Sequence, residues 1–195
     1  MARPKKVATD DILDAIERVV VKYGAARLSI DAVAQEAGIS KSRVVLDYKS
    51  KTALLEALID RDLQRETARI ESALESVADT PHPELFARVK LAEQAPDDTE
   101  RAIVMAITSS MASEVSLKRR LQDWVAHDLQ AMDSGAKPET ARLAFFALIG
   151  FSCHEWFGLI DWNDEQRLSF MEQIRSMYTS CPENQLKNPP DSHKA

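Results

Sequence analysis

The stretch Ser29–Lys51 reads SIDAVAQEAGISKSRVVLDYKSK, and it decides the fold. Its first part, residues 30–37, spaces apolar side chains as one face of a short helix requires. Gly38 follows, and glycine ends helices because it adopts the left-handed backbone without strain. A second short helix is predicted over 41–48. Two short helices joined by a tight glycine turn predict a helix-turn-helix, which places its second helix in the major groove of DNA.

Serines mark the beginnings of the predicted helices in this region. Ser29, Ser40 and Ser50 each precede one, and serine is a favoured N-cap because its hydroxyl accepts a backbone N–H. Upstream, residues 10–23 form an amphipathic pattern, and downstream an apolar stripe over 51–78 predicts a long helix. These signals predict a three-helix head that leads directly into a fourth helix.

Further helical patterns fill the rest of the chain, and β-type alternation is scarce. They are expected at about 84–94, 99–112, 116–133, 139–160 and 164–179. The fold class is therefore all-α with about nine helices. We expect a DNA-binding domain over 1–51, a helical ligand-binding and dimerisation domain over 52–181, and a disordered tail over 182–195.

The composition, the charge distribution and the length of the apolar runs indicate which classes of protein this chain can belong to. The 195 residues are 45% hydrophobic and 29% charged, which is typical of a soluble globular protein. The net charge of −6, taken alone, argues against a nucleic-acid partner. Residues 1–51 nevertheless hold ten Lys and Arg against seven Asp and Glu, so the head is mildly basic. The longest apolar run, Leu143–Cys153, is shorter than the roughly 20 residues of a membrane span. No secretory signal and no disulfide framework are expected, and the cytoplasm is the expected location.

The head resembles the TetR family of regulators. The resemblance runs from Ile12 to about Leu58, and it is strongest over residues 29–42, followed by Tyr48-Lys-Ser-Lys and Leu54-Leu55. It implies a three-helix head joined through a fourth helix to a larger helical body that dimerises and holds a ligand pocket. It further implies that a small molecule bound in the body spreads the two heads and releases the operator.

The resemblance also implies which side chains meet DNA. Ser29 and Ser40 look like the capping serines that meet phosphate at helix N-termini, and Lys51 looks like the family's phosphate-binding lysine. A basic N-terminal arm looks like the extensions that reach a minor groove. The expected DNA-binding residues are Arg3, Lys5, Lys6, Ser29, Ser40, Lys41, Ser42, Arg43, Val45, Asp47, Tyr48 and Lys51.

The second helix departs from the family pattern at several outward positions. Val45 stands where a phosphate-contacting tyrosine is usual, and Asp47 stands where a histidine or similar residue is usual; an aspartate that faces a phosphate is repulsive. Arg43 could compensate by bidentate contact with guanine. Asp47 could accept from cytosine N4, or pair with Arg43 four residues earlier and hold it in place.

The predicted helix over 139–160 has apolar side chains on every face, so we expect it to be buried nearly all round. One side would pack in its own domain and the other against a second copy, with the alternative of a purely intramolecular core. Two glycines eight residues apart would let two helices approach closely. The expected dimer-interface residues are Gly150, Phe151, Phe157, Gly158, Met171, Ile174 and Tyr178.

Six residues lie where pockets of this family are usually found, although plain core is the simpler interpretation of each one taken alone. They are Met105, Met111, Trp124, His127, Phe146 and His154. Their aromatic and methionine character suits a largely apolar small molecule. No spacing of His and Cys suits a metal, and no cofactor motif or catalytic pair is present in the sequence.

The sequence thus predicts a DNA-binding transcriptional regulator rather than an enzyme, most simply a homodimeric repressor. A small molecule would release it from a near-palindromic operator. The alternative is a dimeric helical module that binds a ligand or a protein and whose DNA readout is weakened by Val45 and Asp47. Membrane association is not expected.

Overall fold

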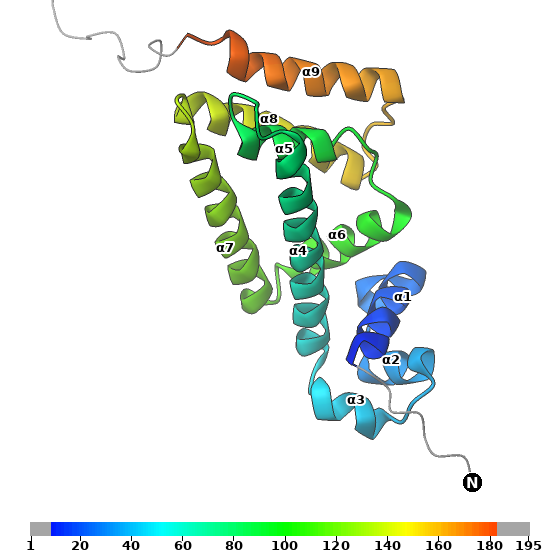
Figure 1. Cartoon of the computed structure of the whole chain (residues 1–195). Helices are drawn as coiled ribbons and strands as arrows, with labels where there is room; N and C mark the ends of the chain where they lie inside the picture. The colour runs from blue at the N-terminus through cyan, green and yellow to red at the C-terminus, as the bar shows by residue number, and fades with distance from the viewer. Residues whose placement is uncertain (1–8, 183–195) are drawn as a thin grey trace, which may run out of the picture. The chain divides into compact units, whose positions relative to one another are not determined.

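The computed structural model describes residues 9–182, and over this range every regular element is helical (Figure 1). The elements are α1 (Thr9–Arg27), α2 (Ile30–Ala37), α3 (Lys41–Asp47), α4 (Lys51–Ser76), α5 (Pro83–Leu91), α6 (Asp98–Ser110), α7 (Val115–Ala131), the 3₁₀ turn η1 (Met132–Ser134), α8 (Pro138–Trp156) and α9 (Asp164–Ser180). The all-α class with nine α-helices is confirmed for the described residues. Among these helices none is both long and apolar enough to cross a membrane.

The helix expected over 139–160 ends earlier than the sequence pattern suggested. α8 stops at Trp156 because Gly158 adopts a φ of 61° and reverses the chain. The Leu159 N–H donates to the His154 carbonyl over 2.9 Å, and the Gly158 N–H donates to the Glu155 carbonyl over 3.1 Å. This pair of bonds is a Schellman cap. The apolar residues after Trp156 therefore belong to a loop, which periodicity alone did not reveal.

The chain forms two compact units, and each is made of two separate stretches. The first contains residues 9–66 and 96–123, and the second contains 67–95 and 124–182. The structure therefore groups the chain differently from the division expected after residue 51. α6 and the beginning of α7 join the first unit because Ile103, Ile107 and Leu117 are buried in its core.

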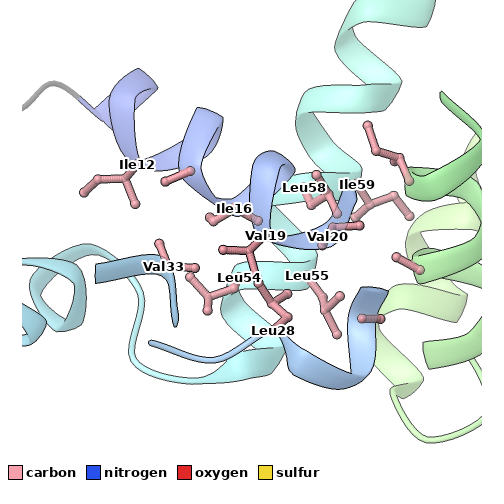
Figure 2. Packing of buried hydrophobic residues seen from close by; sticks show 14 of the residues in the cluster. Ile12, Ile16, Val19, Val20, Leu28, Val33, Leu54, Leu55, Leu58 and Ile59 are labelled. Carbon is pink, nitrogen blue, oxygen red and sulfur yellow. The ribbon is translucent and has the colours of Figure 1, made fainter. Parts of the chain in front are cut away.

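The core of the first unit forms where α1, α2 and α4 meet. Figure 2 shows their apolar side chains pointing toward one another. Each of these side chains is at most 2% exposed: Ile12, Ile16, Val19, Val20, Leu28, Val33, Leu54, Leu55, Leu58 and Ile59. Burial on this scale contributes about 1.5–3 kcal/mol per large side chain. α1 and the first turns of α4 thus form the support on which the two short helices rest.

Charged side chains border this core on the α1–α4 side. Arg65 Nη1 donates to both Glu17 carboxylate oxygens over 3.0 Å, and Arg61 donates to Asp14. Asp62, between these two arginines in sequence, has a different environment. Its pKa is raised to about 6, chiefly by burial and further by the negative charges of Glu66, Glu100 and Glu17, against the lowering effect of Arg65.

The core of the second unit joins α5, η1, α8 and α9, and a buried histidine packs against its Tyr178. His82 caps α5: its Nδ1 accepts the Leu85 N–H over 3.1 Å, so its Nε2 carries the proton and donates to the Met132 carbonyl over 3.1 Å. The ring meets Tyr178 edge-on at 5.1 Å between centroids. Gly135 lies against both rings and leaves no room for a side chain.

We expect Gly135→Ala to destabilise the second unit by about 1–3 kcal/mol, the usual effect of forcing an extra methyl group into a packed core. A Cβ at this position would lie 2.5 Å from His82 Cδ2 and 2.8 Å from the Tyr178 hydroxyl oxygen. Urea unfolding followed by tryptophan fluorescence measures the change. Ser134→Ala, on the exposed neighbouring residue, is the control and should remain within about 0.5 kcal/mol of wild type. A Gly135→Ala variant as stable as this control would contradict the close packing.

We expect Asp62→Asn to increase the free energy of unfolding at pH 7–8 by about 1–2 kcal/mol. In the folded chain Asp62 releases its proton at a pKa of about 6, whereas an unfolded aspartate releases it at about 3.9. Between these values the folded state binds more protons, so stability falls as pH rises through this window and stays lowered above it. Urea unfolding followed by circular dichroism from pH 4 to 8 should show a flatter profile for the variant. If the free energies of unfolding of wild type and variant changed with pH in parallel, the raised pKa of Asp62 would be contradicted.

Candidate DNA-binding site

The turn between α2 and α3 positions the candidate DNA-reading helix. Gly38 has φ 66° and ψ 31°, the left-handed conformation. Its N–H donates to the Gln35 carbonyl over 3.2 Å, and the Ile39 N–H donates to the Ala34 carbonyl over 3.0 Å, which completes a Schellman cap. The predicted end of α2 at Gly38 is confirmed. The half-buried Ile39 then packs on the core and fixes the direction in which α3 begins.

The three predicted serine caps are confirmed. The hydroxyl oxygen of Ser29 accepts the Ala32 N–H over 3.1 Å, that of Ser40 accepts the Arg43 N–H over 3.3 Å, and that of Ser50 accepts the Ala53 N–H over 3.0 Å. Each bond satisfies one backbone N–H that the first turn of a helix leaves unpaired. The caps therefore fix where the helices of the head begin.

An ion-pair bridge holds α2 against α1. Glu36 of α2 accepts from Arg18 over 2.8 Å and from Lys22 over 2.9 Å, both on α1. These two hydrogen bonds, Lys22 first, lower the pKa of the Glu36 carboxyl below its ordinary value. The bridge adds to the apolar contacts that position the first two helices of the head.

α3 buries one face and exposes the other. Val44 is fully buried in the core, and the side chains of Lys41, Ser42 and Val45 are exposed. Arg43 is half-buried on the flank of the helix. The predicted outward positions therefore lie on one accessible surface of a helix of two turns.

Two of the cations on this surface are paired with carboxylates. Arg43 Nη1 donates to Asp47 over 2.7 Å within α3, and Lys41 Nζ donates to Asp31 of α2 over 2.9 Å. The intrahelical pair is one of the two roles considered for Asp47 from the sequence. Asp47 therefore partly neutralises the charge of Arg43 and restricts its side-chain positions.

The segment that leads into α4 contributes further groups. Tyr48 ends α3 with its ring half-buried against the core, and burial, followed by the charge of Asp47, raises the pKa of its hydroxyl. Lys51 begins α4, and its ammonium group donates to the Ala26 carbonyl over 3.4 Å. The predicted arm residues Arg3, Lys5 and Lys6 lie outside the described residues 9–182.

Leu46, which is not among the expected DNA-binding residues, is the most exposed apolar residue of α3. Leu46 has 74% of its surface exposed, more than Val45 at 38%. Helical geometry could have identified it, because successive residues differ by about 100° and Leu46 lies about 200° from the buried Val44. It lies on the same accessible surface as Ser42.

The six residues expected to line a ligand pocket are divided between the two units. Met105 and Met111 belong to the first unit, and the other four belong to the second. Met105, His127, Phe146 and His154 are exposed, and Met111 and Trp124 are half-buried. Within the second unit the Trp124 and His127 rings lie 6.3 Å apart.

One cavity of about 340 Å³ lies between α8 and α9 in the second unit, and it includes only His154 of the six. Its walls include an aromatic cluster, in which the Trp162 ring stacks on Phe151 at 5.5 Å and meets Phe170 at 4.7 Å between centroids. The indole N–H of Trp162 is buried and has no hydrogen-bond partner among the described residues. His154 Nδ1 bonds to the Gly150 carbonyl over 2.6 Å.

Four residues expected at a dimer interface are instead used inside their own chain. Phe151, Met171, Ile174 and Tyr178 are at most 7% exposed and belong to the core of the second unit. A side chain already buried in its own core offers no apolar surface to a second copy, so these four assignments are corrected. Phe157, Gly158 and Gly150 remain accessible, although Gly158 lies in the loop after α8 rather than on the helix.

Comparison with known proteins identifies the family to which the chain belongs. Residues 12–58 match the model of the bacterial regulatory proteins, tetR family. Residues 84–179 match the model of the tetracyclin repressor-like C-terminal domain. A search of curated proteins gave no match. The two matched segments cover the helix-turn-helix and most of the second unit.

Solved structures share the fold. The multidrug binding protein EbrR, complexed with imidazole, is 18% identical with a TM-score of 0.66, and the match covers 88% of this chain and 96% of EbrR. The fatty acid degradation regulator FadR from Bacillus halodurans is 14% identical with a TM-score of 0.63, covering 89% and 96%. SmeT, in complex with triclosan, is 19% identical with a TM-score of 0.61, covering 87% and 90%.

The two family matches agree with the observed architecture at both ends of the chain. The first covers the helices that place α3 on an accessible surface, and the second runs from α5 to α9. This is a class of transcriptional regulators rather than of enzymes. The chain belongs to the tetR family of bacterial regulatory proteins and is a DNA-binding, ligand-responsive transcriptional regulator.

Proposed function

We propose that the protein is a homodimeric repressor that binds a near-palindromic operator and is released by a small molecule. One observation carries the DNA-binding part: α3 follows the Gly38 turn with Val44 in the core and its opposite surface free of other described helices. That surface is what a recognition helix inserts into the major groove. A two-fold dimer would present two such helices to two half-sites.

Arg43 is our candidate for direct recognition of guanine. Only its Nη1 bonds to Asp47, and a guanidinium carries further N–H donors in a fixed plane. The bond to Asp47 would hold the guanidinium in place, so that its remaining N–H groups can donate to the O6 and N7 acceptors of a guanine. The aspartate lowers the positive charge of α3, so we assign it to orientation of Arg43 rather than to phosphate binding.

Phosphate contacts are assigned to the remaining predicted residues of the head. Lys41 and Lys51 carry exposed ammonium groups near the two ends of the segment that includes α3. Each ammonium group forms a hydrogen bond that is long or exposed to solvent. Replacing that bond by a contact with a phosphate therefore costs little free energy. The Tyr48 hydroxyl and the caps Ser29 and Ser40 complete this set, with the arm of Arg3, Lys5 and Lys6.

The dimer is proposed to form through the outer face of α8 and α9. On α8 the accessible residues recur at helical spacing: Leu143, Phe146, Ala147, Gly150 and His154. On α9 the facing series is Phe170, Gln173 and Met177, and the cavity of about 340 Å³ lies between the two series. Apolar stripes with a groove between them suit a helix of a second copy, whose burial removes this surface from water.

The effector is proposed to be a small, largely apolar molecule. Multidrug binding protein EbrR and the triclosan complex of SmeT, both similar in fold, support this class. The predicted pocket residues Met105, Met111, Trp124, His127, Phe146 and His154 remain candidates for its contacts. Release would be a population shift, because an effector that favours a conformation unsuited to both half-sites weakens DNA binding by its difference in affinity.

Selection of DNA from a random pool tests the proposal directly. We expect two inverted half-sites and an affinity that falls steeply with salt, because bound lysines and arginines displace counterions from phosphates. Lys41→Gln with Lys51→Gln should reduce the salt slope by about two per half-site, which is about four for the dimer. The pair Lys118→Gln with Arg119→Gln, on exposed positions of α7, is the control and should leave the slope unchanged. If no selected duplex binds with such a slope, the alternative ligand- or protein-binding module is favoured.

The dimer face has its own test. We expect Phe146→Glu to increase the dimer dissociation constant at least about tenfold, because a charge would be buried in an apolar interface. Analytical ultracentrifugation over a dilution series measures it. Leu168→Glu is the matched control, since Leu168 is 50% exposed against 55% for Phe146 but lies on another side of α9. Equal dissociation constants for the two variants would place the interface elsewhere.

A further inference from the structure

We propose that the head recognises thymine 5-methyl groups through Leu46 and Val45, beside the guanine assigned to Arg43. The inference rests on the proposed function, since it names the bases that the same surface would select. It starts from the exposure of Leu46, which at 74% is the most exposed apolar side chain of α3. Val45, at 38%, continues this apolar surface around the helix.

A single exposed leucine is ordinary on a protein surface. Leu46 differs because of its place: it lies almost opposite the buried Val44, where a docked recognition helix meets the groove. Ser42, Val45 and Leu46 are spaced i, i+3 and i+4, so they share one side of the helix. That shared side presents two aliphatic groups and one small hydroxyl.

The chemistry of the major groove then limits what these side chains can recognise. Aliphatic groups neither donate nor accept hydrogen bonds, so they cannot distinguish the polar edges of guanine, adenine or cytosine. The 5-methyl of thymine is the apolar group that the groove presents. Contact with it removes apolar surface of both partners from water.

Arg43, on the flank of α3, would recognise a guanine next to the thymine that Leu46 contacts. Arg43 lies three residues before Leu46 and is held by the bond of 2.7 Å to Asp47. Three residues correspond to about 4.5 Å along the helix, comparable with the rise of about 3.4 Å between base pairs. The half-site is therefore expected to place a guanine on or beside a base pair that contains thymine.

Replacement of thymine by deoxyuridine tests the inference, because it removes one methyl group and leaves base pairing intact. In the duplex selected by the wild-type protein, each thymine of a half-site is replaced in turn, and binding is measured by fluorescence anisotropy at fixed salt. We expect one or two positions at which the wild type loses about fourfold in affinity per half-site, the value for one buried methyl. At those positions Leu46→Ala or Val45→Ala should reduce the loss to less than about twofold.

Two control variants separate apolar contact from a general effect on the head. Leu46→Met keeps an aliphatic side chain of similar volume and should retain the methyl effect. Val115→Ala removes a side chain that is 77% exposed at the start of α7, and it should bind every duplex as the wild type does. Thermal unfolding verifies that all variants are folded.

The outcomes distinguish this inference from the proposed function. Strong, salt-dependent binding to the selected duplex with no effect of deoxyuridine at any position overturns the inference and leaves the repressor proposal intact. A methyl effect that persists unchanged in Leu46→Ala and Val45→Ala also overturns it, since another residue would then contact the methyl. Failure to select any duplex overturns both.

Discussion

The left-handed turn at Gly38 determines which side of α3 faces the core. Because the turn and the Schellman bonds fix the direction of the chain, Ile39 packs inward and Ser40 begins the next helix one residue later. Val44 is then the one fully buried residue of α3, and the rest of the helix is available for contact. A residue with a Cβ at position 38 would be strained at this φ, so the presentation of the reading surface depends on glycine.

Charge on the reading surface is balanced rather than simply positive. Asp31 and Asp47 each accept from a cation that would otherwise be available to phosphates. Such exposed pairs contribute little to stability, because solvent screens them and side-chain entropy opposes them. Their effect lies in orientation and in a lower nonspecific attraction to DNA. A surface with fewer uncompensated cations depends more on shape and on contacts with individual bases.

The apolar helix α8 buries one side in the core of the second unit and leaves the other side exposed. Its inward residues Phe145, Leu148 and Phe151 pack on α5 and α9 within the unit, and its outward residues Leu143 and Phe146 remain exposed. The sequence predicted burial all round, and in a single chain only one side is buried. The exposed side is the physical basis for the proposed dimer. The buried pair Arg167 and Glu155, bonded over 2.7 Å, fixes the end of this helix against α9.

Local signals in the sequence determined the helical class, the position of the helix-turn-helix and the caps at Ser29, Ser40 and Ser50, because these depend on residues a few positions apart. The Arg43–Asp47 pair was also within reach, since i and i+4 residues are neighbours on any helix. Only the tertiary structure decided which apolar residues are buried. Phe151, Met171, Ile174 and Tyr178 were expected at an interface, yet they fill their own core, whereas Leu46 remains in solvent. Periodicity shows that a side chain is apolar and on which side of a helix it lies, but the long-range packing of the other helices determines which side is covered.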